Sequence, residues 1–126
     1  MQGLHLTADL HNCRCEPHWL RDADTLGKWC AEAAASAGMR PVGTLFHTFP
    51  PTGQTPGGAV VSLLLDDETQ INVHTWPAQK AVALDLYVST LGGKSPAMAR
   101  SLMLVLADRF APEWTEQRSL DRGDDS

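Results

Sequence analysis

The sequence predicts an α+β fold: a two-layer α/β sandwich in which two helices pack on one face of a mostly antiparallel sheet. Apolar residues recur every three or four positions in two segments, 24–38 and 95–110, which is typical of amphipathic helices. Other segments alternate apolar and polar residues, which is typical of half-buried strands. The resulting order, β-α-β-β-β-β-α-β, is satisfied most economically when both helices cover the same face of the sheet.

Six strands are predicted, most of them bounded by turn-forming residues. They cover residues 4–9, 41–49, 59–65, 70–74, 81–88 and 113–120. In the first of them, Leu4, Leu6 and Ala8 alternate with polar residues. The segment PPTGQTPGG (50–58) is predicted as a loop, because its prolines and glycines disfavour regular strand pairing.

Each predicted helix has local start or stop signals. In the first helix, Asp24 is the predicted N-cap, and Gly38 stands where a glycine commonly ends a helix. In the second helix, Ser95 is expected to cap the free amides, and Pro96 is preorganised for the first turn. The mostly polar stretch 11–24 is predicted to connect the first strand to the first helix.

Length and composition limit the class of protein. With 126 residues, 43% of them hydrophobic and 20% charged, the chain is expected to form one soluble domain over residues 1–120, followed by a polar tail over 121–126. Its formal charge of −5 argues against nucleic-acid binding, which needs a basic surface. Its apolar runs are too short to span a membrane and its N-terminus has no secretory signal, so we expect a cytoplasmic protein.

The cysteines raise the question of a metal site. Two of the three lie in the run HNCRCEPH (11–18), where two thiolates and two imidazoles could form a tetrahedral site. The Cys-x-Cys spacing is tighter than usual for such sites, and no second cysteine pair follows. We therefore expect a loop with a partly buried thiol, and no metal.

Chemistry-bearing residues concentrate in the stretch DDETQINVHTWP (66–77). It offers a hydroxyl nucleophile in Thr69, a potential base in His74 and an aromatic wall in Trp76. Taken by themselves, these residues indicate a soluble α/β domain with a small-molecule site. The alternative is that the aromatic residues are core side chains and that His74 is required only by the fold.

Four segments resemble one family. The element His74-Thr75-Trp76-Pro77 resembles the His-Thr-Trp-Pro of the bacterial S-adenosylmethionine decarboxylase proenzymes. The other three segments are Gly3-Leu4-His5-Leu6 with Asp9 and Cys13, Leu45–Phe49, and Ala83–Tyr87. The resemblance implies a two-layer α/β sandwich that assembles as a homodimer and acts on a small-molecule substrate as a carboxy-lyase in spermidine (polyamine) biosynthesis.

The resemblance also implies a covalent cofactor made from the chain itself. In the family a serine attacks the preceding carbonyl, and β-elimination then splits the chain and leaves a pyruvoyl group. That ketone forms a Schiff base with the substrate amine and accepts the electrons released with CO₂. Carried over, the processing residues are Glu68, Thr69 and His74; the catalytic residues are Thr69, His74 and Ser89; and the substrate-binding residues are Phe49, Trp76 and Asp9.

Three positions depart from the family pattern. Thr69 stands where the self-cleaving serine is expected, so processing would give a 2-oxobutanoyl group instead of a pyruvoyl group. Ser89 replaces a proton-donating cysteine, and Ala78 replaces a glutamate that holds the ribose hydroxyls. Two functions stay open: a self-processing decarboxylase of S-adenosylmethionine or another amino acid, and an unprocessed, non-catalytic homologue that binds a metabolite or an active paralogue.

Overall fold

The computed structural model describes residues 2–66, 68–89 and 95–123. Its elements are β1 (Gln2–Cys13), α1 (His18–Arg21), α2 (Ala23–Ser36), β2 (Pro41–Thr48), β3 (Ala59–Leu65), β4 (Gln70–Trp76), the 3₁₀ helix η1 (Pro77–Gln79), β5 (Ala81–Ser89), α3 (Pro96–Asp108) and β6 (Pro112–Gly123). The strands form one sheet in the order β2-β3-β4-β5-β1-β6, and all of its neighbours are antiparallel. The predicted α+β class and the order of the predicted elements are confirmed.

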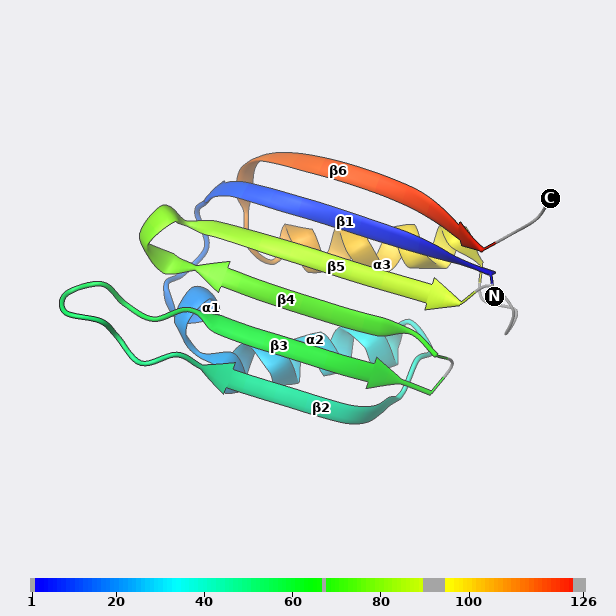
Figure 1. The fold of residues 1–126 in the computed structure, drawn as a ribbon, viewed down its shortest axis with the longest axis horizontal. Helices are drawn as coiled ribbons and strands as arrows, with labels where there is room; N and C mark the ends of the chain where they lie inside the picture. Colours follow the sequence, from blue (N-terminus) through cyan, green and yellow to red (C-terminus); the bar gives the residue numbers. More distant parts are fainter. Residues whose placement is uncertain (1, 67, 90–94, 124–126) are drawn as a thin grey trace.

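The helices lie on one side of the sheet, as Figure 1 shows. The longer ones divide the sheet between them: α2 packs against β2 and β3, and α3 packs against β5 and β1. Side chains that alternate toward these helices form the core, and the largest fully buried ones include Leu10, Leu26, Ile71, Leu84, Leu86 and Phe110. Each such side chain contributes about 1.5–3 kcal/mol to folding.

The other side of the sheet is covered by no helix in the described part of the chain. We call this side the open face. In each strand every second side chain points to it, among them His5, Asp9, His74 and Asp85. These positions are half-buried, whereas their neighbours in sequence are buried under the helices. The alternation read from the sequence therefore predicts correctly which side chains face away from the core.

The start of the first long helix differs from the prediction. Its N-cap is Asp22 and not Asp24, because the Asp22 carboxylate accepts hydrogen bonds from the backbone N–H groups of Asp24 (3.1 Å) and Thr25 (3.3 Å). The same carboxylate accepts a hydrogen bond from the Thr25 hydroxyl (2.7 Å), and these bonds lower its pKa. The stretch predicted as a connection also contains the one-turn helix α1.

The chain end is also more ordered than predicted. Strand β6 continues to Gly123, so Asp121 and Arg122 pair with Leu4 and Gly3 of β1 and do not belong to a tail. The rest of the predicted tail, 124–126, lies outside the described residues. By contrast, the predicted start of α3 is confirmed, since the Ser95 hydroxyl accepts a hydrogen bond from the Met98 N–H.

Candidate active site

The predicted site residues fall into two groups at opposite ends of β4. Thr69 lies in the turn before the first residue of β4, while His74 and Trp76 lie at its far end, beside the loop 50–58 (Figure 1). Five residues of extended strand, at 3.3 Å each, separate Thr69 from His74 by about 16 Å. The structure does not bring these two residues together within one chain.

The first group surrounds the bond between Glu68 and Thr69. Glu68 has a φ of 63°, in the left-handed region that costs a residue with a Cβ atom about 1–2 kcal/mol. Thr69 is fully buried, and its carbonyl oxygen accepts a hydrogen bond from the Leu65 N–H (2.8 Å). Its hydroxyl oxygen is buried and has no hydrogen-bond partner among the described residues. A nucleophile therefore sits unpaired beside the carbonyl of a conformationally strained residue.

Ser89 lies at the same end of the sheet. It is the last residue of β5, it is buried, and it pairs with Gly3 of β1. Strand β4 pairs with β5 so that Gln70 lies opposite Tyr87. Continuing this register into the turn places Glu68 opposite Ser89. Ser89 and the Glu68–Thr69 bond therefore lie at the same end of neighbouring strands.

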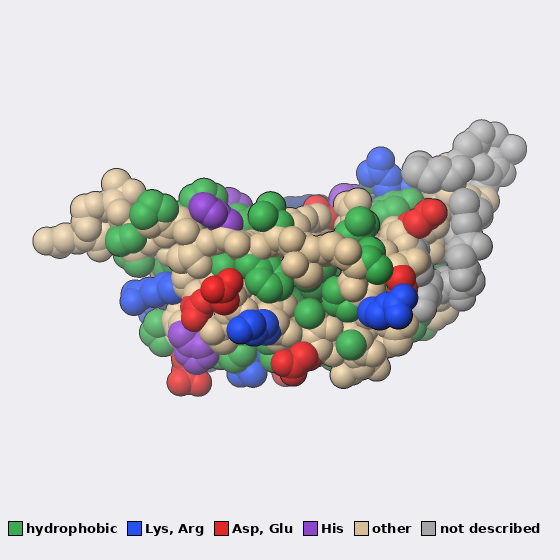
Figure 2. All heavy atoms as spheres, turned by 90° about the horizontal axis from the view of Figure 1, so that it is seen from below, with side chains coloured by type: hydrophobic (Ala, Val, Ile, Leu, Met, Phe, Trp, Pro, Cys, Tyr) green, Lys and Arg blue, Asp and Glu red, His purple; other side chains and the backbone are tan. Residues whose placement is uncertain are grey.

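The second group is a cluster of stacked rings, Phe49, His74 and Trp76. The centroids of the His74 and Trp76 rings are 4.1 Å apart with their planes at 14°, and those of Phe49 and His74 are 6.2 Å apart at 22°. Phe49 is 43% exposed and Trp76 41% exposed, so the alternative of core aromatics is wrong. Figure 2 views the molecule from the side and shows histidine and hydrophobic side chains gathered next to the projecting loop.

A cavity of ≈ 390 Å³ opens beside this cluster. It is lined by Phe49, Thr55, Pro56, Gly58, His74, Thr75, Trp76, Pro77, Ala78 and Gln79. Among the described residues, its polar groups are hydroxyls, an amide and an imidazole, with no carboxylate. Aromatic walls with a few polar groups are typical of small-molecule sites. Ala78 lines the cavity where the family pattern has a carboxylate, so hydrogen bonding to ligand hydroxyls must come from elsewhere.

Thr75 fixes the cavity wall, a role that the sequence analysis missed. Its buried hydroxyl accepts a hydrogen bond from the Ala59 N–H (2.8 Å) and donates one to the Leu20 carbonyl oxygen (2.6 Å). At the base of the loop 50–58, the Phe49 N–H donates to the Gly58 carbonyl oxygen (2.8 Å). A Cβ atom on Gly58 would lie 2.1 Å from the Thr75 carbonyl oxygen, so only glycine permits this approach. The sequence did contain a signal for this role, since Thr75 has a hydroxyl at a position that the strand alternation predicts to be buried.

Asp9 lies on the open face, level with His74 of the ring cluster. In the sheet register it pairs with Ala83, which pairs with His74 on the other side, so Asp9 and His74 are two strands or about 10 Å apart. Its carboxylate accepts a hydrogen bond from the Arg118 guanidinium (3.0 Å). The structure therefore places Asp9 about 10 Å from the ring cluster and does not place it in the cavity lining.

The cysteines do not form a metal centre in the described part of the chain. Cys13 and Cys30 are buried and Cys15 is half-buried. No group of three or more histidine, cysteine or acidic side chains is placed to hold a metal ion among the described residues. Burial raises the pKa of the Cys13 thiol to about 11, which disfavours the thiolate that a metal needs. In the same part of the chain, no helix is both long and apolar enough to cross a membrane.

The fold and the site together define a two-layer α+β domain with a buried hydroxyl in a strand turn and an aromatic cavity at the far end of the next strand. The family model described as S-adenosylmethionine decarboxylase matches residues 4–123. The chain therefore belongs to the S-adenosylmethionine decarboxylase family.

Similar proteins agree with this assignment. The S-adenosylmethionine decarboxylase proenzyme of Thermococcus gammatolerans is 32% identical over 122 residues, which cover 96% of this chain and 76% of that protein. The proenzyme of Persephonella marina is 27% identical over 121 residues, covering 96% and 82%. The crystal structure of the adenosylmethionine decarboxylase from Aquifex aeolicus shares the fold, with a TM-score of 0.81 at 22% identity, covering 99% of this chain and 93% of that chain.

Proposed function

We propose that this chain is a self-processing S-adenosylmethionine decarboxylase of polyamine (spermidine) biosynthesis that is cleaved at the Glu68–Thr69 bond. The observation that carries the proposal is the buried Thr69 hydroxyl beside the left-handed Glu68, for which the described part of the chain offers no hydrogen-bond partner. An unpaired buried hydroxyl costs folding free energy, which a purely structural threonine would avoid by finding a partner. The proenzyme names of the relatives agree with a cleavage reaction.

Cleavage uses atoms of this chain and one water molecule. The Thr69 hydroxyl oxygen attacks the Glu68 carbonyl carbon, the C–N bond breaks, and the amide becomes an ester with a free Thr69 amine. Loss of the Thr69 α-proton to a base then breaks the Cβ–O bond and leaves a chain that ends in the Glu68 carboxylate. Water replaces the amine nitrogen, ammonia leaves, and a 2-oxobutanoyl group remains. This group supplies an electron sink for the loss of CO₂ from the substrate.

The base of the elimination step comes from a second copy of the chain. His74 is the candidate base, but about 16 Å of strand separates it from Thr69, whereas proton transfer requires about 3 Å. A twofold axis that stacks two open faces and runs across the strands turns one sheet end for end against the other. It thereby brings His74 of the second copy over the Thr69 end of β4 of the first, where the backbone of Thr69 carries the α-proton. The proposed assembly is therefore a homodimer.

The open face is suited to such an association. Large apolar side chains exposed on it are Leu45, Phe49, Leu64, Trp76, Trp114 and Leu120. Its charged pairs are His5 with Asp85, His11 with Glu116 (2.9 Å) and Arg118 with Asp9 (3.0 Å). An exposed apolar surface on which several polar side chains are already paired with one another is typical of a protein interface.

A complementation experiment tests the shared site. One chain carries Thr69→Ser with His74→Ala, and the other carries Thr69→Ala with His74 intact. Neither should cleave alone, and cleavage of the first chain should appear when the two are co-expressed. Cleavage of Thr69→Ser with no cleavage in the mixture would place the base in the same chain. Cleavage by the first chain alone would remove His74 from the mechanism.

The processing rate depends on the methyl group of Thr69. A β-branched side chain has restricted χ1 freedom, so we expect intact mass spectrometry of the wild-type protein to find mostly one 126-residue chain. Thr69→Ser should increase the fraction cleaved. Adding Ser89→Cys should increase release of labelled CO₂ from carboxyl-labelled substrate, because a thiol is a stronger proton donor than a hydroxyl. A folded double variant that neither cleaves nor releases CO₂ would contradict the enzyme proposal.

The second candidate function is that of a non-catalytic homologue that binds a metabolite or an active paralogue. The observation that favours it is the cavity without a carboxylate, where Ala78 stands. Under both functions, S-adenosylmethionine should bind weakly, and Ala78→Glu should tighten binding about tenfold or more, the value of one charged hydrogen bond. Gln79→Glu adds the same charge one residue away and is the matched control. Equal gains from both variants in calorimetry would mean that charge alone matters.

A further inference from the structure

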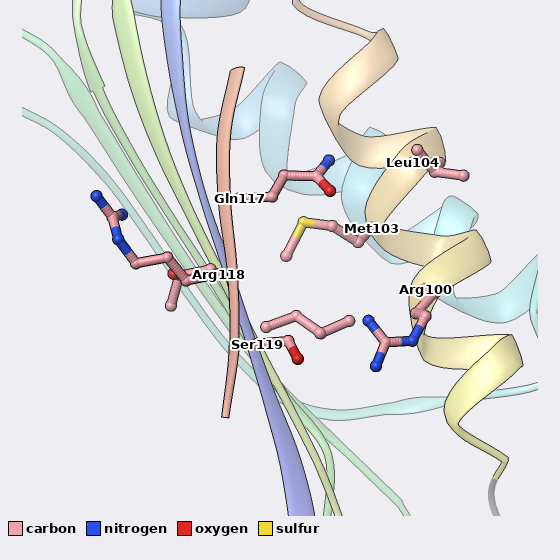
Figure 3. Close-up of a pocket in the computed structure, with 8 residues that line it drawn as sticks. Arg100, Met103, Leu104, Gln117, Arg118 and Ser119 are labelled. Atoms are coloured by element: carbon pink, nitrogen blue, oxygen red, sulfur yellow. The ribbon is translucent and has the colours of Figure 1, made fainter. Parts of the chain in front are cut away.

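A second cavity, of ≈ 380 Å³, lies between α3 and the edge strand β6, on the helix side of the sheet (Figure 3). Its lining residues are Leu6, Thr7, Arg100, Met103, Leu104, Gln117, Arg118 and Ser119. It exists because α3 packs over β5 and β1 and leaves most of β6 uncovered. None of its lining residues belongs to the candidate active site.

The cavity has an apolar floor and a polar rim. Leu6 and Met103 form the floor and are buried, and Leu104 adds an exposed apolar wall. On the rim, Arg100 extends from α3 toward β6, while Gln117 and Ser119 face α3 from alternate positions of the strand (Figure 3). Guanidinium, amide and hydroxyl groups therefore surround one apolar surface.

The charge around the cavity favours an anion. Within the described ranges, no acidic side chain lines it and none forms an ion pair with Arg100. The acidic neighbours along β6 are Glu116, which pairs with His11 and Arg118 on the open face, and Asp121, two residues beyond Ser119. On α3 the following acidic residue is Asp108, two helical turns beyond Arg100. The chain has a net charge of −5, whereas the charged side chains that line this hollow are the arginines Arg100 and Arg118.

We propose that this cavity is a binding site for a small aliphatic monocarboxylate. Arg100 would hold the carboxylate through its planar guanidinium, and Gln117 and Ser119 would donate further hydrogen bonds. The alkyl chain would lie on Leu6 and Met103. The cavity volume is within the range of small-molecule sites, and one charged group with an apolar floor selects an acid over a neutral molecule of the same length.

The test is a titration of the full chain with hexanoate, followed by ¹H–¹⁵N NMR. Hexanoate should shift the amides around Arg100, Met103 and Ser119, and hexan-1-ol and acetate should bind at least tenfold more weakly. Arg100→Gln should weaken hexanoate binding at least tenfold. Arg118→Gln is the matched control, because the Arg118 guanidinium points to the opposite face (Figure 3) and bonds Asp9.

Three results would overturn the proposal. They are unchanged hexanoate binding by Arg100→Gln, equal binding of hexan-1-ol, and amide shifts confined to the open face. Should Arg100→Gln fail to fold, Gln117→Leu tests the same rim from the strand side and should also weaken hexanoate binding. None of these measurements depends on cleavage or decarboxylation.

Discussion

Removing one hydroxyl, in Thr75→Val, should destabilise the whole domain. The substitution keeps the size and branching of the side chain and deletes only its hydrogen bonds. In the structure that hydroxyl accepts a hydrogen bond from the N–H of Ala59 and donates one to the carbonyl oxygen of Leu20, and all three residues are buried. Each backbone group left without a partner costs about 1–3 kcal/mol, so the expected loss is about 2–6 kcal/mol. That is a large fraction of the 5–15 kcal/mol typical of a domain.

The assay is urea unfolding followed by tryptophan fluorescence, with Thr75→Ser as the matched control. Serine keeps the hydroxyl and loses one methyl group, so it should cost only about 1 kcal/mol. The order of unfolding free energies should be wild type, then Thr75→Ser, then Thr75→Val. A valine variant as stable as the serine variant would mean that the hydroxyl does not hold β3, β4 and α1 together.

Two further predictions concern packing and thiol chemistry. Gly27→Ala should lower the free energy of unfolding by about 1–3 kcal/mol in the same assay, because its Cβ atom would lie 2.3 Å from a ring carbon of Phe46. Gly43→Ala is the control and should cost little, because its Cβ atom would lie 3.6 Å from the nearest atom. Equal losses in the two variants would contradict the reasoning. Burial raises the pKa of Cys13 to about 11 and of Cys30 to about 12, so a thiol reagent at pH 8 should first label the remaining, half-buried cysteine. The thiols of the unfolded chain ionise near their usual pKa of 9.0, whereas the buried thiols of the folded chain stay protonated. The free energy of unfolding should therefore decrease as the pH rises above about 9. A free energy that stays constant up to pH 10 would contradict this.

The fold was predictable where local patterns carry it. The alternation of apolar and polar residues with a period of two located the strands, and the capping pair Ser95-Pro96 located the start of α3. The first long helix was misplaced because Asp22 and Asp24 are equally good caps in sequence, and only the position of Thr25 decides between them. The length of β6 had no local signal at all. Its polar end is held by the N-terminal residues of β1, about a hundred positions away in sequence.

The site was predicted as a set of residues but not as a geometry. Thr69 and His74 lie five residues apart in one short motif, and this closeness in sequence suggests that their side chains lie together in one site. Strand conformation separates them, since five residues span about 16 Å in a strand and about 7.5 Å in a helix. Asp9 shows the opposite effect: it is remote in sequence, yet it lies two strands from His74 because β1 inserts between β5 and β6. Proximity in this sheet follows strand order, which the sequence pattern does not encode.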